Sequence, residues 1–380
     1  MDFSFTEEQV LLRNSVQRYI QDKYSFEVRK KILASEAGWS RDNWRAFAEL
    51  GLLAAPFAEE YGGFGGGALE AMIIMEEFGK GLVVEPYLQT VVLCGGLINL
   101  AGSAAQKSEY LPKIASGELI MALAHAEPQG RFNLADILTR AEKGGDGFVL
   151  NGAKAVVTAA PWAGKLIIPA RTSGAQRDRR GVTLFIVDKN APGISCRDYP
   201  TIDGQRASEI SFENVKAGGN AVLGGVGAGL AILEEAVDRA IAAQCAEAVG
   251  CMRVLTDATV EYCKTRKQFG QPIGKFQVLQ HRMVDMFMEC EQSLSMTYMV
   301  NLKLDEGEAE RIRAASAAKA QIGKAGRFVG QQAIQLHGGM GMTDELNVGH
   351  YFKRLTMIDA QFGNVDYHLK RFAAAGQTDR

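Results

Sequence analysis

Hydrophobic residues recur at helical spacing over residues 1 to about 115. Thr6-Glu7-Glu8-Gln9 has the form of a capping box, whose side chains satisfy two backbone donors at a helix start. The apolar residues that follow share one helical face: Leu12, Val16, Tyr19 and Ile20. A second helix is expected after Ser40, with Gly51 as its stop. Helical patterning over 70–78 and 90–100 completes a part of the chain that we expect to be all-α.

Near Ala122 the pattern changes to short apolar runs, which predict β-strands. Residues 148–150 predict a strand, Asn151-Gly152 a hairpin turn, and 156–157 the returning strand. The polar stretch 173–180 is expected to be an exposed loop. Further strands are expected over 166–168, over 182–187 and around Ile210, Phe212 and Val215. Strands between two helical blocks indicate a small β domain set inside an α protein.

From Gly224 onward the hydrophobic pattern is helical again. One long helix is expected from Leu230 to about Thr265. A second helix carries apolar residues on one face: Leu279, Met283, Met286, Phe287 and Cys290. The segment 311–336 is dominated by Ala and Gly, and such small residues let helices approach closely in a bundle or a subunit interface.

The composition is that of an ordinary globular protein. The chain has 380 residues, of which 47% are hydrophobic and 23% charged, and this length allows two or three domains. The net charge of -2 offers no basic face to a nucleic acid. No apolar run reaches the roughly 18–20 residues of a membrane span, and the first residues lack a signal-peptide pattern. We therefore expect a cytoplasmic protein without nucleic-acid or membrane partners.

The six cysteines and five histidines do not form a metal-binding pattern. The sequence contains no Cys-x-x-Cys pair and no His-Glu-x-x-His motif, so no metal site is expected. Cys245, Cys251 and Cys290 lie in apolar helical stretches, where we expect them to be buried, unreactive thiols.

Two stretches carry candidate chemistry. Arg266–Ile273, followed by Phe276 and Gln277, lies where one long helix should end and the next begin. On physical grounds alone it is typical of a helix–helix turn with a solvated arginine. In Gln335–Gly341, three glycines within four positions free the backbone for close approach to a ligand, although a plain helix C-terminus has the same composition.

Together these stretches resemble the acyl-CoA dehydrogenase family. Further matching stretches are Glu127-Pro128, Gly152–Thr158, Asp203–Arg206, Phe212–Val215 and Leu223-Gly224. The resemblance spans nearly the whole chain. It implies an α+β fold with an N-terminal all-α domain (1–117), a β-barrel-like middle domain (118–222) and a C-terminal four-helix bundle (223–380).

The resemblance also implies a reaction, the FAD-dependent α,β-desaturation of an acyl-CoA thioester in lipid or steroid catabolism. The α proton must be removed by a carboxylate, while hydrogen bonds polarise the thioester carbonyl. The β hydride passes to the flavin, and an electron-transfer flavoprotein is the expected acceptor of the electrons.

The resemblance places these functions on particular residues. The adenosine diphosphate half of FAD held by a neighbouring subunit would contact Arg266, Gln268, Phe269, Phe276 and Gln277. The same region would be contacted by Gln335, Leu336, Gly338 and Gly339. The hydroxyl of Thr158 would lie near flavin N5, and the segment with His125 and Ala126 would edge the flavin pyrimidine.

The sequence departs from the family at three places. Residues 129–133 replace a run of small residues, which puts the backbone contacts of this loop to FAD and CoA in doubt, and Ala126 replaces a hydroxyl residue. The two positions where the family carries its base hold Phe362 and Ala240, and neither can accept a proton.

Three acidic residues lie near these positions and are candidates for the base. Glu247 lies about two helical turns after Ala240, on the same face but about 10 Å along the axis, and is the best candidate. Asp238 faces elsewhere on that helix. Asp366 is expected to be a helix-start or solvated acid.

This pattern resembles the small subunits of two-gene acyl-CoA dehydrogenases for pimeloyl-CoA or steroid side-chain CoA esters, most closely over 350–359. One interpretation is a subunit of a heterotetramer whose sister chain supplies the base. The alternatives are a self-sufficient homo-oligomer with an unusual base such as Glu247, and a flavin-free structural subunit. The intact Arg266 and Phe269 argue against the last.

Overall fold

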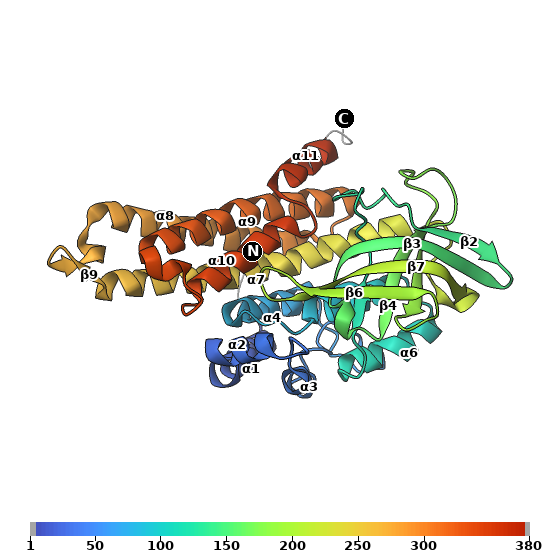
Figure 1. Cartoon of the computed structure of the whole chain (residues 1–380), viewed down its shortest axis with the longest axis horizontal. Coiled ribbons are helices and arrows are strands. Elements are labelled where there is room, and N and C mark those ends of the chain that lie inside the picture. Colours follow the sequence, from blue (N-terminus) through green and yellow to red (C-terminus); the bar gives the residue numbers. More distant parts are fainter. Residues whose placement is uncertain (1–4, 377–380) are drawn as a thin grey trace. The chain divides into compact units, whose positions relative to one another are not determined.

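The computed structural model of the chain describes residues 5–376, which form two compact units (Figure 1). We call the unit made of residues 5–34, 68–83 and 241–376 the helical unit. The unit made of residues 35–67 and 84–240 is called the sheet unit. The boundary at residue 240 falls within the long helix α7 (Gly229–Thr265), which has nearly the predicted bounds.

The helical unit is organised around α9, which packs against α8, α10 and α11. Its helices are α1 (Glu7–Lys23), α2 (Phe26–Ala34), α4 (Ala68–Gly81), the C-terminal part of α7, α8 (Gln277–Lys303), α9 (Glu308–His337), α10 (Val348–Ala360) and α11 (Val365–Ala375), coloured orange to red from α8 onward in Figure 1. Between α7 and α8 lie a hairpin of β9 (Lys267–Gln268) and β10 (Gln271–Pro272) and the 3-10 turn η5 (Ile273–Lys275). A second 3-10 turn, η6 (Gly338–Met342), follows α9.

Helix α1 begins with the predicted capping box. The backbone N–H of Gln9 donates to Thr6 Oγ1 (3.2 Å), and the N–H of Thr6 donates to Gln9 Oε1 (3.1 Å). Val16 and Ile20 form the buried face of this helix, which packs against α4. The local sequence therefore fixes both the start of α1 and the face that it buries.

The small residues of α9 bring α10 close, as the sequence predicted. A Cβ added to Gly330 would lie 2.5 Å from Phe352 Cδ2, and one added to Gly323 would lie 2.2 Å from Asp359 Oδ1. Real Cβ atoms do not approach other atoms this closely, so a larger residue at either position would have to displace the side chain of Phe352 or Asp359.

The apolar face predicted for α8 is only partly buried. Met286 and Cys290 are buried, but Phe287 is 57% exposed. Residues four apart share a helix face, whereas the next residue along lies about 100° around the axis. Met286 and Cys290 thus set the buried face, and Phe287 lies outside it.

The sheet unit combines short helices with one mixed eight-stranded sheet of order β6-β7-β3-β2-β4-β5-β8, with β1 paired in parallel to β4. Its strands are β1 (Met121–Leu123), β2 (Arg140–Gly144), β3 (Gly147–Thr158), β4 (Lys165–Arg171), β5 (Val182–Asp188), β6 (Ile194–Pro200), β7 (Arg206–Gly218) and β8 (Val222–Leu223). Its helical elements are α3 (Arg41–Glu49), η1 (Glu59–Tyr61), the π-helical η2 (Leu88–Gly95), α5 (Gly96–Ala101), α6 (Ala104–Ala115), η3 (Ala160–Trp162), η4 (Gly219–Ala221) and the start of α7.

Local signals at the start of this unit are confirmed. Ser40 caps α3 by accepting a hydrogen bond from the N–H of Asn43 (3.2 Å), and the chain leaves this helix at Gly51, whose φ is 75°. Between residues 5 and 117 the structure has helices and turns and no strand, as the periodicity predicted.

The hairpin predicted at Asn151-Gly152 is wrong. Strand β3 continues through both residues, and its pairing with β7 shifts register between Leu150 and Gly152. Gly152 has a φ of 148°, and a Cβ there would lie 2.6 Å from Thr139 Cα, so the glycine serves a bulge. The hairpin lies earlier, at Gly145, where β2 meets β3.

In the part of the chain that the structure describes, no helix combines the length and the apolar character that crossing a lipid bilayer requires.

Candidate active site

The Arg266–Ile273 stretch forms an exposed hairpin in the helical unit. Helix α7 ends at Thr265, so Arg266 follows the helix, and its backbone carbonyl accepts from the N–H of Ile273 (2.8 Å). Phe269 occupies the tip with a φ of 55°, and its side chain is 90% exposed. Its ring contacts that of Phe276 at a centroid distance of 6.0 Å. The hairpin thus presents an arginine, an amide and an aromatic ring together.

The glycine stretch lies beside the base of this hairpin. The rings of Tyr262, near the end of α7, and His337, the last residue of α9, stack with centroids 4.4 Å apart. Tyr262 Oη also donates to the carbonyl of His337 (3.4 Å). The structure therefore brings together the two motifs that the sequence placed in the helical unit. Within the second motif, Gln335 is exposed and Leu336 is buried.

The remaining predicted cofactor residues belong to the sheet unit. His125 and Ala126 are the second and third residues after the end of β1, and the carbonyl of Ala126 accepts from the N–H of Ala155 in β3 (2.9 Å). Thr158 is the last residue of β3 and pairs with Ala207 of β7. Strand β3 therefore carries Thr158 at its end and, through Ala155, holds the segment that contains His125 and Ala126.

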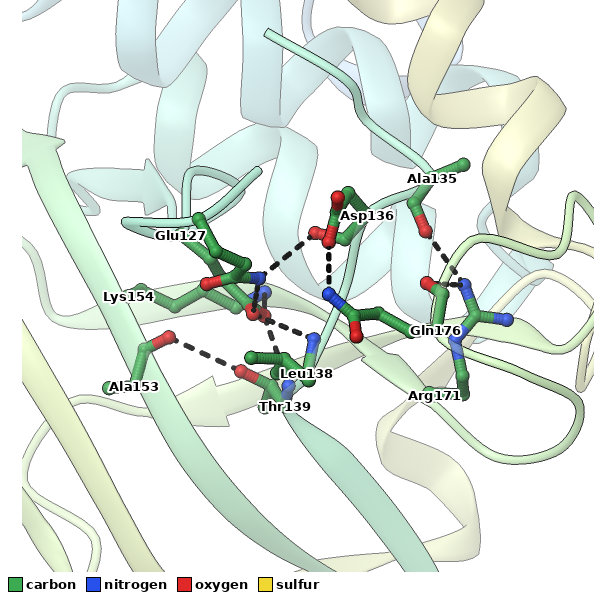
Figure 2. A network of polar contacts seen from close by, with 10 residues as sticks. Glu127, Ala135, Asp136, Leu138, Thr139, Ala153, Lys154, Arg171 and Gln176 are labelled. Carbon is green, nitrogen blue, oxygen red and sulfur yellow. Dashed lines mark hydrogen bonds and ion pairs between the residues drawn. The ribbon is translucent and has the colours of Figure 1, made fainter. Parts of the chain in front are cut away.

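A buried ion pair anchors the segment that contains His125 and Ala126 (Figure 2). Lys154 Nζ, on β3, donates to Glu127 Oε1 at 2.7 Å, and both side chains are almost fully buried. Glu127 also accepts from the backbone N–H groups of Leu138 (2.7 Å) and Thr139 (3.1 Å). Burial alone would raise the pKa of the Glu127 carboxyl, but Lys154 and these hydrogen bonds hold that pKa below its ordinary value.

The same pair affects His125. Burial and the nearby Lys154 charge lower the pKa of His125 to about 4, so the ring is neutral at pH 7. A neutral imidazole and an ion pair therefore lie next to each other in the segment that the sequence predicted to contact the flavin.

The loop that departs from the family is held by side chains. Asp136 accepts from Gln176 Nε2 at 2.6 Å (Figure 2). It also accepts from Arg177 Nε at 2.6 Å, so the two contacts tie the loop after β1 to the loop between β4 and β5. Arg171 donates to the carbonyl of Ala135 (2.8 Å) and to that of Gln176 (2.9 Å). The predicted loop over 173–180 is thus a loop, but its inner side is an organised network.

The two positions where the family carries its base lie on or beside helices of this chain. Ala240 is buried in α7, and Phe362 lies half-buried in the turn between α10 and α11, with a φ of 59°. Asp366 is exposed in the first turn of α11, as expected of a helix-start acid, and Asp238 is buried.

The carboxylate of Glu247 is bound by an arginine. Arg354 of α10 donates to both of its carboxylate oxygens, from Nε at 2.6 Å and from Nη2 at 2.8 Å, and both side chains are buried. A carboxylate that binds a guanidinium at two points is a poor acceptor for a carbon-bound proton. The geometry therefore favours a structural role for Glu247.

Comparison with known proteins decides the family. Models of the N-terminal, middle and C-terminal domains of acyl-CoA dehydrogenases match residues 6–118, 122–215 and 227–376. Mitochondrial isovaleryl-CoA dehydrogenase of Pongo abelii is 32% identical over 354 residues, which cover 92% of this chain and 84% of that protein. The chain belongs to the acyl-CoA dehydrogenase family. It therefore belongs to a family of flavoprotein oxidoreductases that act on acyl-CoA thioesters, and its α+β fold is the one expected.

Two solved structures extend the comparison to the fold. A variant of the steroid ACAD Tcur3481-Tcur3483 superposes with a TM-score of 0.89 at 28% identity, covering 98% of each chain. The FAD complex of PigA superposes with a TM-score of 0.92 at 27% identity, covering 100% of each chain. FAD is the cofactor of this family of acyl-CoA dehydrogenases, as the sequence predicted.

The residues of this acyl-CoA dehydrogenase chain fit the diphosphate of FAD. Arg266, Gln268 and Gln335 are exposed and offer a guanidinium and two amide donors, which suit phosphate oxygens. A Cβ added to Gly338 or Gly339 would meet no atom within 4 Å, so the backbone there is open to a ligand.

Three buried charged residues of this chain were not predicted from the sequence to have a role. Lys154 and Arg354 lie in stretches that carry the resemblance, but their partners are 27 and 107 residues away in the chain. Lys319 is a fully buried lysine in α9. Its signal in the sequence is a single charge within the run Ala317-Ala318-Lys319-Ala320, on a helix face that otherwise requires small residues.

Proposed function

We propose that this chain is a FAD-binding subunit of a heteromeric acyl-CoA dehydrogenase, whose catalytic base comes from a sister chain. The reaction is the α,β-desaturation of an acyl-CoA thioester. The observation that carries the proposal is the state of the base positions. Ala240 and Phe362 have no proton acceptor, and both oxygens of Glu247 are bound by Arg354.

The roles that we propose for the chain's own residues are those that the resemblance to the family implies. Arg266, Gln268, Phe269, Phe276 and Gln277 would hold the adenosine diphosphate half of FAD bound by a neighbouring subunit, next to Gln335–Gly339. His125, Ala126 and Thr158 would hold the flavin end. When bound, FAD supplies the acceptor for the β hydride. The neutral His125 and the pairing of Ala126 with Ala155 keep this segment fixed without placing a free charge at its surface.

The neighbouring proteins support a divided enzyme. The steroid ACAD Tcur3481-Tcur3483 carries a two-part name, and its chain superposes on this one along nearly its full length. We propose the same kind of assembly here, a tetramer that passes electrons to an electron-transfer flavoprotein. The domain bounds 1–117, 118–222 and 223–380 are part of the proposal and are supported by the three matched segments.

The test is to purify the chain alone and together with its sister subunit, and to follow flavin bleaching by saturated acyl-CoA without oxygen. The proposal expects bleaching by the pair and none by the lone chain. Bleaching by the lone chain that Glu247→Gln abolishes would establish a self-sufficient enzyme with Glu247 as its base. A preparation of the pair that retains no yellow flavin would support a structural subunit instead.

A further inference from the structure

The turn between α10 and α11 has a strained backbone. Phe362 has a φ of 59°, and Gly363 follows with a φ of 115°. Left-handed backbone is rare for a bulky aromatic residue and persists only where the surroundings impose it. A Cβ at Gly363 would lie 2.4 Å from Tyr367 Cδ1, so no other residue fits there without movement. The geometry of this turn is therefore imposed by its neighbours.

Lys319 of α9 binds the turn on both sides of Phe362. Its Nζ donates to the carbonyls of Ile358 (2.7 Å) and Asp359 (3.1 Å), near the end of α10, and to that of Gly363 (2.8 Å). The side chain is fully buried. One ammonium group thus fixes the distance between the end of α10 and the residue that follows Phe362.

His368 of α11 binds the carbonyl of Phe362 itself, with Nε2 3.0 Å from the oxygen. Burial and the nearby Lys319 charge lower the pKa of His368 to about 3, so the ring is neutral and its Nε2–H donates. The backbone around Phe362 is therefore bound by Lys319 of α9 and by His368 of α11.

A buried ammonium is a costly way to satisfy helix carbonyls, because the charge must leave water. The end of α1 shows a simpler device, since the backbone N–H of Tyr24 donates to the carbonyl of Ile20 (3.0 Å). What Lys319 adds is a fixed relation between the carbonyls on either side of residue 362, and this relation holds the backbone from which the residue 362 side chain projects.

We propose that Lys319 and His368 are positioning residues that hold the ring of Phe362 in one orientation, and that this ring contacts the acyl group of the bound thioester. The second half rests on the proposed function, in which residue 362 occupies a position that carries the base in other members of the family. Here the position selects among acyl groups by shape instead of removing a proton.

The experiment places 4-fluorophenylalanine in place of Phe362 and records its ¹⁹F NMR spectrum in the full chain loaded with FAD, in the parent, Lys319→Met, His368→Leu and His368→Gln. The positioning role predicts one sharp line in the parent and in His368→Gln, whose amide can still donate. Lys319→Met or His368→Leu should give broadened or multiple lines while the circular dichroism stays that of the parent. If Lys319→Met does not fold, His368→Leu alone decides. Parent-like sharp lines in every folded variant overturn the positioning role.

The acyl contact is tested on the same labelled parent, with its sister subunit present. Butanoyl-, octanoyl-, pimeloyl- and cholanoyl-CoA are added in turn, with free CoA as the control, and flavin absorbance reports binding. The expected result is a ¹⁹F shift that follows the acyl group and is missing with free CoA, together with a change of at least tenfold in relative affinity among the thioesters in Phe362→Leu. Binding without a ¹⁹F shift overturns the acyl contact. If none of the thioesters binds, the proposed function fails and the acyl contact fails with it, while the line shapes still decide the positioning role.

Discussion

Glu247 and Arg354 are held to each other at two points, and both are buried. They come from α7 and α10, 107 residues apart in the chain. The pair joins these two helices of the helical unit and uses the carboxylate that otherwise stands as the best candidate for a base. A single contact thus bears on both stability and mechanism.

Removing Arg354 should destabilise the chain strongly. Arg354→Met leaves the Glu247 carboxylate buried without its guanidinium, which typically costs about 3–5 kcal/mol. Urea unfolding measures the loss. Lys264→Met is the matched control, because its partner Glu261 (2.5 Å) is exposed and the pair should contribute little. The double variant Arg354→Met with Glu247→Met should recover most of the stability. A small effect of Arg354→Met would mean that water reaches the pair.

A carboxylate at position 362 should give the lone chain activity. In Phe362→Glu, loaded with FAD, we expect bleaching by acyl-CoA at least about 100-fold faster than in the parent chain, since a positioned base typically contributes 10²–10⁴-fold. Phe362→Gln is the control, because it has nearly the same shape and cannot take the proton. A Phe362→Glu chain that binds acyl-CoA but bleaches no faster than Phe362→Gln would show that position 362 does not reach the α proton.

Substitutions at two glycines should have different effects, one on cofactor binding and the other on stability. At Gly339 an added methyl meets no atom, so Gly339→Ala should leave the unfolding midpoint unchanged while FAD retention falls, because the methyl occupies space meant for the ligand. At Gly323 the added Cβ would lie 2.2 Å from Asp359 Oδ1, and Gly323→Ala should cost about 1–3 kcal/mol through overpacking. Calorimetry and flavin absorbance after gel filtration measure the two effects. Unchanged FAD retention in Gly339→Ala would place the diphosphate elsewhere.

Acid should destabilise the chain partly through His125. Its pKa falls from 6.5 to about 4 on folding, so between these values the unfolded state binds the proton and the folded state does not. Stability is therefore complete above pH 6.5 and is lost as the pH falls toward 4, by up to about 1.4 kcal/mol per pH unit. In His125→Gln the acid limb of the stability curve should be flatter by that amount. Above pH 7 the two curves should run parallel, and parallel curves below pH 6 would contradict the burial of a neutral ring.

Local signals in the sequence were enough to predict many elements. The capping box at Thr6, the N-cap at Ser40 and the small residues of α9 each act over a few residues, and their helices are where the sequence placed them. The turn predicted at Asn151-Gly152 was wrong because glycine is needed at position 152 for another reason. Thr139, which is distant in the sequence, lies too close to leave room for a Cβ there. The same residue type thus serves a bulge or a hairpin, and only the pairing partner distinguishes them.

The candidate site shows the same difference between local signals and contacts that are distant in the sequence. The family motifs predicted a cofactor role for the Arg266 hairpin and the glycines after α9, because each motif consists of contiguous residues. The contacts Lys154–Glu127, Arg354–Glu247 and Lys319–Gly363 join segments far apart in the chain. Periodicity does not report which buried charge meets which, so these partners required the folded structure.

The phenyl ring at position 362 has a consequence for the ancestry of the chain. Under the genetic code, no phenylalanine codon shares a letter, position by position, with a glutamate codon, so the change between them cannot occur in one mutational step. In the proposed function, a gene that encodes Phe362 does not acquire a glutamate codon by a single point mutation, so its product stays dependent on the sister chain for deprotonation.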